Sequence, residues 1–118
     1  MNTAIKNSLL FFTFSYLISC GDTQLKISHM VIKNDRLGTL LDTKSQNELK
    51  ILARVFDEKI EAPNAGPEFR YLIDITTSVG TIRWQYSLDG YIRNYEESNS
   101  MIYQLKDVTL FNRTAHLL

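Results

Sequence analysis

The sequence predicts an α+β domain with one main helix packed on a four-stranded antiparallel meander, an extra N-terminal strand and a short C-terminal helix. A length of 118 residues leaves room for one compact core. After Ser45, apolar residues recur every three or four positions, whereas from Phe69 onward they alternate with polar residues. This change of period places the main helix before the strands of the meander.

The N-terminal strand is predicted over residues 25–32. Leu25, Ile27 and Val31 fall on one face of an extended chain, which makes that face more apolar than the other. The segment that follows, residues 34–43, is predicted to be a loop.

The main helix is predicted to begin at Ser45, because Ser45 and Glu48 have the spacing of a capping box. Residues 63–67 include two prolines and a glycine, so the helix is expected to end before them. Its buried face consists of apolar residues at helical spacing: Leu49, Leu52, Phe56 and Ile60.

Cross-strand alignment in the meander follows from the turns. Asp89-Gly90 is typical of a two-residue hairpin turn, which places Trp84 opposite Tyr95 and Tyr86 opposite Arg93. One aromatic-rich face of the meander is therefore expected to point toward the main helix.

The other two turns are predicted from the same alternation. An even-length loop at 79–80 aligns Ile73 with Tyr86, and a three-residue turn over 98–100 precedes the fourth strand. Asp107 is expected to cap the short C-terminal helix. The apolar residues of that helix are Val108, Phe111, Ala115 and Leu117.

Composition excludes several classes of function. Thirteen basic residues balance thirteen acidic ones, so the chain is not expected to bind nucleic acid. Two histidines and one cysteine are too few for a structural zinc site or a disulfide framework, and we expect no metal and no cofactor. The sequence offers no pair of nucleophile and base at a spacing known from catalysis. We therefore expect a protein that is not an enzyme.

The first nineteen residues have the pattern of a secretory signal peptide. Lys6 is their one charged residue, and a largely apolar run over residues 9–18 follows it. This run is shorter and more interrupted than a membrane-spanning helix requires. It ends in Leu17-Ile18-Ser19-Cys20, which resembles the lipobox of bacterial lipoprotein precursors.

The resemblance implies that Cys20 becomes acylated and that the chain is cut before it. Residues 1–19 would be the signal peptide, 20–24 a lipidated tether and 25–118 a single α+β domain. Gly21 stands where an aspartate would favour the inner membrane, so the resemblance implies the periplasmic face of the outer membrane. The alternative is a plain signal peptide followed by a buried cysteine. No motif identifies a family for residues 25–118.

Tyr91, Arg93 and Tyr95 combine aromatic rings with a cation, a composition enriched in protein interfaces. They are the candidate partner-binding residues. The function expected from the sequence is a lipid-anchored interaction module of the cell envelope, either an assembly component or an inhibitor or immunity protein, with an envelope protein as its partner. The alternative is a small-ligand carrier whose pocket, between helix and sheet, is lined by aromatic side chains: Phe56, Trp84 and Tyr86.

Overall fold

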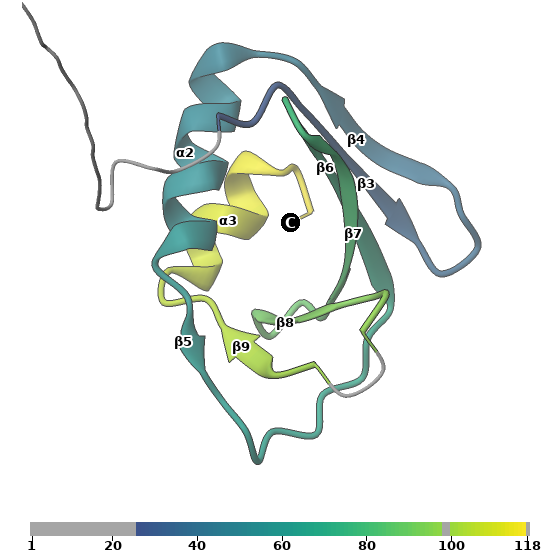
Figure 1. The fold of residues 1–118 in the computed structure, drawn as a ribbon, viewed down its shortest axis with the longest axis vertical. Helices are drawn as coiled ribbons and strands as arrows, with labels where there is room; N and C mark the ends of the chain where they lie inside the picture. Colours follow the sequence, from purple (N-terminus) through teal and green to yellow (C-terminus); the bar gives the residue numbers. More distant parts are fainter. Residues whose placement is uncertain (1–25, 98–99, 118) are drawn as a thin grey trace, which may run out of the picture.

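The computed structural model describes residues 26–97 and 100–117. In this part of the chain, a fully antiparallel sheet of seven strands curls around two helices (Figure 1). Its strand order is β4-β3-β6-β7-β8-β9-β5. The elements are β3 (His29–Asn34), β4 (Thr39–Thr43), α2 (Gln46–Asp57), β5 (Ile60–Glu61), β6 (Tyr71–Thr77), β7 (Gly80–Tyr86), β8 (Tyr91–Asn94), β9 (Ile102–Gln104) and α3 (Val108–Thr114).

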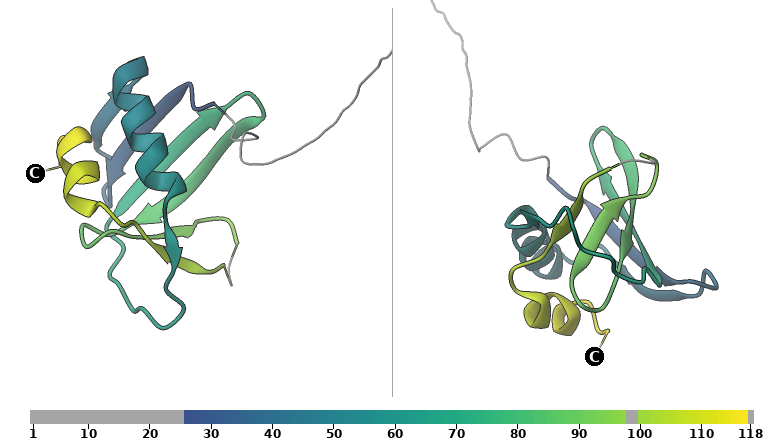
Figure 2. Two further views of the ribbon diagram at one scale, coloured as in Figure 1. Left: turned by 90° about the vertical axis from the view of Figure 1, so that its left-hand side faces the viewer. Right: turned by 90° about the horizontal axis from the view of Figure 1, so that it is seen from below.

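Both helices lie against one face of the sheet, which we call the inner face, and no described element covers the opposite, outer face (Figure 2). The buried core lies between the helices and the inner face. Its members are Met30, Ile32, Leu41, Leu49, Leu52, Val55, Phe56, Ile73, Ile75, Tyr86, Ile92, Leu105, Phe111 and Ala115. The fold therefore has two layers, and half of the sheet surface is left without a helical cover.

The predicted architecture of one main helix on a four-stranded meander is wrong. Strands β6 to β9 follow one another in the sheet, but β3 and β4 extend it beyond β6, and β5 pairs with β9 at the other edge. The structure is mostly β, with two short helices. Sequence alternation did not reveal β4 and β5 because they have only five and two residues and lie at the edges.

Asn34 explains why the segment predicted to be a loop turns back and forms β4. Its Oδ1 atom accepts hydrogen bonds from the backbone N–H groups of Arg36 (2.9 Å) and Gly38 (2.8 Å). Leu37, between them, has a φ of 64°. The Asn34 side chain thus organises a tight turn, and the chain pairs with β3 instead of remaining irregular.

The start of α2 is confirmed, but its predicted end is wrong. The side chain of Ser45 accepts from the Glu48 N–H group (3.3 Å), as in a capping box. The Glu48 carboxylate binds the hydroxyl of Thr43 (2.7 Å) rather than the cap backbone. Helix α2 ends at its twelfth residue, and Ile60 lies in the edge strand β5, where it is 49% exposed.

The C-terminal helix is confirmed. An oxygen of Asp107 accepts from the Leu110 N–H group (3.2 Å) and caps α3. Phe111 and Ala115 are fully buried on the face that meets α2 and the sheet.

The turn between β6 and β7 has two residues, Ser78 and Val79. Ile73 consequently pairs with Trp84 rather than with Tyr86. The alignment predicted from the sequence is wrong by two residues. Because side chains alternate with a period of two, this error leaves every residue of β7 on the expected face.

The turn between β7 and β8 has three residues rather than two. The Ser87 N–H group donates to the carbonyl of Tyr91 (3.0 Å), and the residues between them are Leu88, Asp89 and Gly90. The predicted pairs of Tyr86 with Arg93 and of Trp84 with Tyr95 are therefore wrong. Tyr86 pairs with Ile92, and Trp84 pairs with Asn94.

This one-residue difference exchanges the faces of β8. Ile92 points into the core and is fully buried. Tyr91, Arg93 and Tyr95 lie on the outer face, away from the helices, and not on the inner face as predicted.

Gly90 makes the three-residue turn possible. Its φ of +95° is a conformation that residues with a side chain rarely adopt. A Cβ atom at this position would lie 2.2 Å from Cγ2 of Val108 in α3. The Gly90 carbonyl also accepts from the Leu105 N–H group (2.8 Å). Gly90 is therefore the point where the turn between β7 and β8 contacts both α3 and the residue that follows β9.

We expect Gly90→Ala to lower the free energy of unfolding by about 2–4 kcal/mol, because the added methyl group both strains the backbone and overlaps Val108. Gly66→Ala is the matched control. Its Cβ would meet no atom within 4 Å, and its φ lies outside the left-handed region. Urea denaturation of both variants measures the difference, and equal midpoints would show that the turn tolerates a side chain.

Candidate functional site

The outer face carries the candidate partner-binding residues. We call the outer patch the four side chains Arg83, Tyr91, Arg93 and Tyr95. Backbone pairing holds β7 beside β8 here. The Tyr95 N–H group donates to the Arg83 carbonyl (3.0 Å), and Gln85 pairs with Arg93. The structure therefore places all three residues singled out from the sequence on one open surface and adds Arg83 to them.

Arg93 is held in place without an acidic partner among the described residues. Its Nε and Nη2 atoms both donate to Oε1 of Gln85, at 3.0 and 2.9 Å. Its guanidinium carbon lies 4.9 Å from the centre of the Phe69 ring. A neutral amide and an aromatic ring orient the cation but do not neutralise it. Arg93 therefore presents an uncompensated positive charge on the outer face.

Arg83 is bound to a carboxylate. Its Nε and Nη2 atoms donate to the two oxygens of Asp74 at 2.7 and 3.0 Å, and Nζ of Lys33 lies 3.9 Å from the same carboxylate. The hydrogen bonds from Arg83 hold the pKa of Asp74 below its usual range. Arg83 and Lys33 thus lie on either side of Asp74 on the outer face, and Glu96 lies near enough to Arg83 to contribute to its raised pKa.

Tyr95 is the most accessible ring of the outer patch. It is 52% exposed, and the Arg83 guanidinium lies 5.8 Å from the centre of its ring. Tyr91 is half-buried on the same face. Exposed tyrosine beside arginine is a composition from which protein interfaces draw much of their binding free energy.

Phe69, Gln85 and Asp74 support the outer patch but were not expected from the sequence to do so. Phe69 precedes β6, and its ring lies beneath Arg93. The alternation of β6 and β7 does place Asp74 and Gln85 on the outer face. Their pairing with particular arginines depends on strand alignment, which sequence alternation alone does not determine.

The interior between α2 and the sheet is filled at the place where the ligand-carrier alternative requires a pocket. Tyr86 is fully buried and its hydroxyl donates to Oδ1 of Asn112. Phe56 and Trp84 pack edge to face with ring centres 4.9 Å apart. They line only a shallow notch of about 190 Å³ at the open end of the sheet, which Ile75 and Ile82 also line.

The aromatic rings beside this notch surround a cation. Nζ of Lys59 lies 4.9 Å from the ring centre of Phe56, 5.8 Å from that of Trp84 and 5.4 Å from that of Tyr103. Burial lowers the pKa of Lys59. The chain's own ammonium group therefore occupies the space among the three rings and ties the end of α2 to the sheet.

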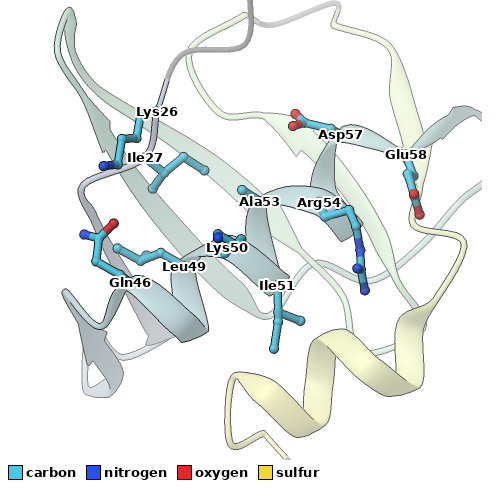
Figure 3. Close-up of a pocket in the computed structure, with 10 residues that line it drawn as sticks. All are labelled: Lys26, Ile27, Gln46, Leu49, Lys50, Ile51, Ala53, Arg54, Asp57 and Glu58. Atoms are coloured by element: carbon cyan, nitrogen blue, oxygen red, sulfur yellow. The ribbon is translucent and has the colours of Figure 1, made fainter. Parts of the chain in front are cut away.

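A larger groove of about 720 Å³ runs along α2 beside the start of the described chain (Figure 3). Lys26 and Ile27 border it on one side, and Leu49, Lys50 and Arg54 of α2 border it on the other. Four of its lining residues are apolar, Ile27, Leu49, Ile51 and Ala53, and Figure 3 shows no set of polar groups that converge on one point. This surface lacks the ordered polar contacts that distinguish the outer patch.

Each histidine contacts one carboxylate. Nε2 of His29 lies 2.6 Å from Asp42, and Nε2 of His116 lies 3.1 Å from Glu48. Within residues 26–97 and 100–117, no group of three potential ligand residues is placed to hold a metal ion. Neither described helix is long and apolar enough to cross a membrane. Cys20, the predicted lipidation site, lies outside the described residues.

Comparison with known proteins gives no match to any family model, curated protein or solved structure. The resemblance to a lipobox and the outer patch are the two features of this chain that bear on its function.

We expect Asp74→Asn to lower the free energy of unfolding at neutral pH by about 1–2 kcal/mol, because Arg83 loses a partly buried charged partner. The folded-state pKa of Asp74 is depressed, so its contribution is present above the unfolded-state pKa of about 4 and is lost as pH falls through the folded-state value. The variant should therefore lose less stability than the parent between about pH 5 and pH 2.

Urea unfolding at several pH values measures this difference. Asp35→Asn is the control, because Asp35 is exposed and forms no salt bridge within the described part of the chain. If the free energy of unfolding changes with pH in the same way for the parent and Asp74→Asn, the stabilising role of the Asp74–Arg83 ion pair is contradicted.

Proposed function

We propose that this chain is a lipid-anchored lipoprotein of the bacterial cell envelope whose outer patch binds a partner protein without catalysing a reaction. The observation that carries the binding proposal is the uncompensated charge of Arg93 on a sheet face that no described element covers. An ordered cation on the same face as the exposed ring of Tyr95 is suited to an acidic partner surface. The partner would belong to an envelope assembly or be a protein that this chain inhibits.

The membrane location rests on the leader sequence. A charged start, an apolar run and a small residue before Cys20 occur in the order that lipoprotein precursors use. Several acyl chains on one cysteine hold a protein on a bilayer almost irreversibly, since each buried methylene contributes about 0.8 kcal/mol. By the identity of Gly21, the proposed location is the periplasmic face of the outer membrane.

A small-ligand carrier is the weaker proposal. Drug-sized ligands typically occupy pockets of about 300–1,000 Å³ that enclose most of their surface. The notch lined by Phe56 and Trp84 has about 190 Å³, and Tyr86 does not reach it. The groove along α2 has about 720 Å³, but its polar groups do not converge on one point (Figure 3). The outer patch, in contrast, offers an ordered set of charged and aromatic groups.

We expect Cys20→Ser to abolish acylation of the chain, because the thioether with lipid can form only on a thiol. Metabolic labelling with a radioactive fatty acid, followed by isolation of the chain from membranes, measures this effect. Ser19→Ala is the matched control, since it keeps a small residue before the cysteine and should retain the label. Label that persists in the Cys20→Ser chain would contradict the lipidation proposal.

We expect Arg93→Ala to weaken partner binding at least about tenfold, because arginines at the centre of interfaces commonly contribute about 2 kcal/mol or more. A photo-reactive aromatic amino acid in place of Tyr95 would cross-link the partner in intact cells. The yield of cross-linked product with and without Arg93→Ala measures the loss of binding. The variant should melt close to the parent temperature, because Arg93 bonds only to a neutral amide.

Two controls separate binding from folding. The same photo-reactive residue in place of Thr109, which is exposed on α3, should give no cross-link to that partner. Arg113→Ala removes an exposed arginine from α3 and should leave the Tyr95 cross-link unchanged. Equal yields for the parent and Arg93→Ala would show that the outer patch is not the binding surface.

A further inference from the structure

The position where the described chain begins restricts which surface can face a membrane. Both the N–H group and the hydroxyl of Ser28 donate to the carbonyl of Thr76, at 2.9 and 3.3 Å. The chain therefore enters the domain beside the turn that joins β6 and β7, as Figure 2 also shows. Cys20 precedes Lys26 by six residues, a length of chain that reaches about 20 Å at most when extended.

Two exposed aliphatic side chains lie at this end of the sheet. Val79, in the two-residue turn, is 73% exposed, and Ile82 is 44% exposed. Half-buried Ile27 and Trp84 lie between them and the core, where they border the notch. We call these four residues the turn-end surface. Turns that face water are usually built from polar residues or glycine, so the valine at this tip is an apolar side chain available for contact.

The turn-end surface carries little charge, which suits contact with a lipid surface. Residues 26–28 and 75–84 contain no acidic residue, and of their two basic residues Arg83 is paired with Asp74, which leaves Lys26. Asp57 is the one acidic side chain that lines the notch. A phospholipid headgroup region attracts basic side chains such as that of Lys26.

We propose that the turn-end surface rests on the lipid bilayer to which Cys20 is anchored, with Val79 and Ile82 in the headgroup region. This inference depends on the proposed lipidation of Cys20. Two aliphatic side chains are too little apolar surface to hold a free protein on a bilayer. The short tether keeps them beside it at high effective concentration, so a weak contact is enough to orient the domain.

The orientation has a consequence for the outer patch. Strand β7 starts at the turn-end surface and runs away from it, and Arg83 is three residues from Gly80. At about 3.3 Å per residue, Arg83 lies about 10 Å along the strand from that end. The outer patch would therefore face sideways, just above the lipid surface, where a neighbouring envelope protein could reach it.

Trp84 is the single tryptophan of the chain and serves as an internal probe. The full chain would be purified from membranes, and the mass of its Cys20 peptide would establish acylation. It would then be reconstituted into vesicles of phosphatidylethanolamine and phosphatidylglycerol that contain lipids brominated near the headgroup. We expect the bromines to quench Trp84 fluorescence and Val79→Asp to abolish most of that quenching.

Leu88→Asp is the matched control. Leu88 is also an exposed aliphatic residue in a turn, 40% exposed, but it lies at the opposite end of β7. Its variant should be quenched as strongly as the parent. Thermal melting checks that both variants fold, and Val79→Ser, which adds no charge, replaces Val79→Asp if that variant melts early.

The outcomes separate this inference from the proposed function. A Cys20 peptide without acyl groups would overturn both. An acylated chain whose Trp84 emission ignores the brominated lipids, or which Leu88→Asp affects as strongly as Val79→Asp, would overturn the membrane contact alone. A photo-reactive residue in place of Val79 that cross-links to a protein or to a second copy of this chain, rather than to lipid, would also overturn it.

Discussion

The length of the turn between β7 and β8 is the constraint on which the rest of the structure depends. Its three residues, Leu88 to Gly90, place Ile92 in the core and Arg93 on the outer face. A turn shorter by one residue would exchange these faces and bury a guanidinium group that has no carboxylate partner in the described part of the chain, which would cost several kcal/mol. Gly90 permits the longer turn because it accepts a φ of +95° beneath Val108.

The same turn also fixes the C-terminal helix. Asn112 of α3 donates its amide to the Leu88 carbonyl (3.1 Å), and its amide oxygen accepts from the Tyr86 hydroxyl. Burial raises the pKa of Tyr86 far above its usual range, and the phenol is a neutral donor at physiological pH. A helix of seven residues is unstable in isolation, so α3 depends on this buried polar contact and on Phe111 for its position.

The sequence was most informative where structure is decided locally. Ser45 and Asp107 marked the two helix starts correctly, because a cap depends on residues only three positions away. The number of strands, the end of α2 and the alignment of β8 were wrong, because they depend on partners far along the chain. Ile60 illustrates this: its helical spacing suited α2, but pairing with Gln104 of β9 placed it in an edge strand.

The candidate site shows the same difference between what local sequence and long-range pairing determine. The sequence identified Tyr91, Arg93 and Tyr95 as a mixture of rings and charge, a property of composition. The predicted alignment put them on the same face as Trp84 and Tyr86, because Asp89-Gly90 fits a two-residue turn as well as the last two positions of a three-residue turn with a glycine at its end. The contact between Val108 and Gly90 is long-range, and it could not be inferred from the turn residues alone.

An anchored domain does not need a large interface to find its partner. In the proposed function both molecules occupy one membrane surface, so the tether would raise the effective concentration of the outer patch, and a modest contact area would give substantial occupancy. Under these conditions charge and orientation decide which partner binds, more than buried area does. Arg93 suits this role, because Gln85 and Phe69 fix the direction of its guanidinium while leaving its charge available. Arg83 differs, since Asp74 already neutralises it, so it supports Tyr95 and the patch but contributes less to the choice of partner.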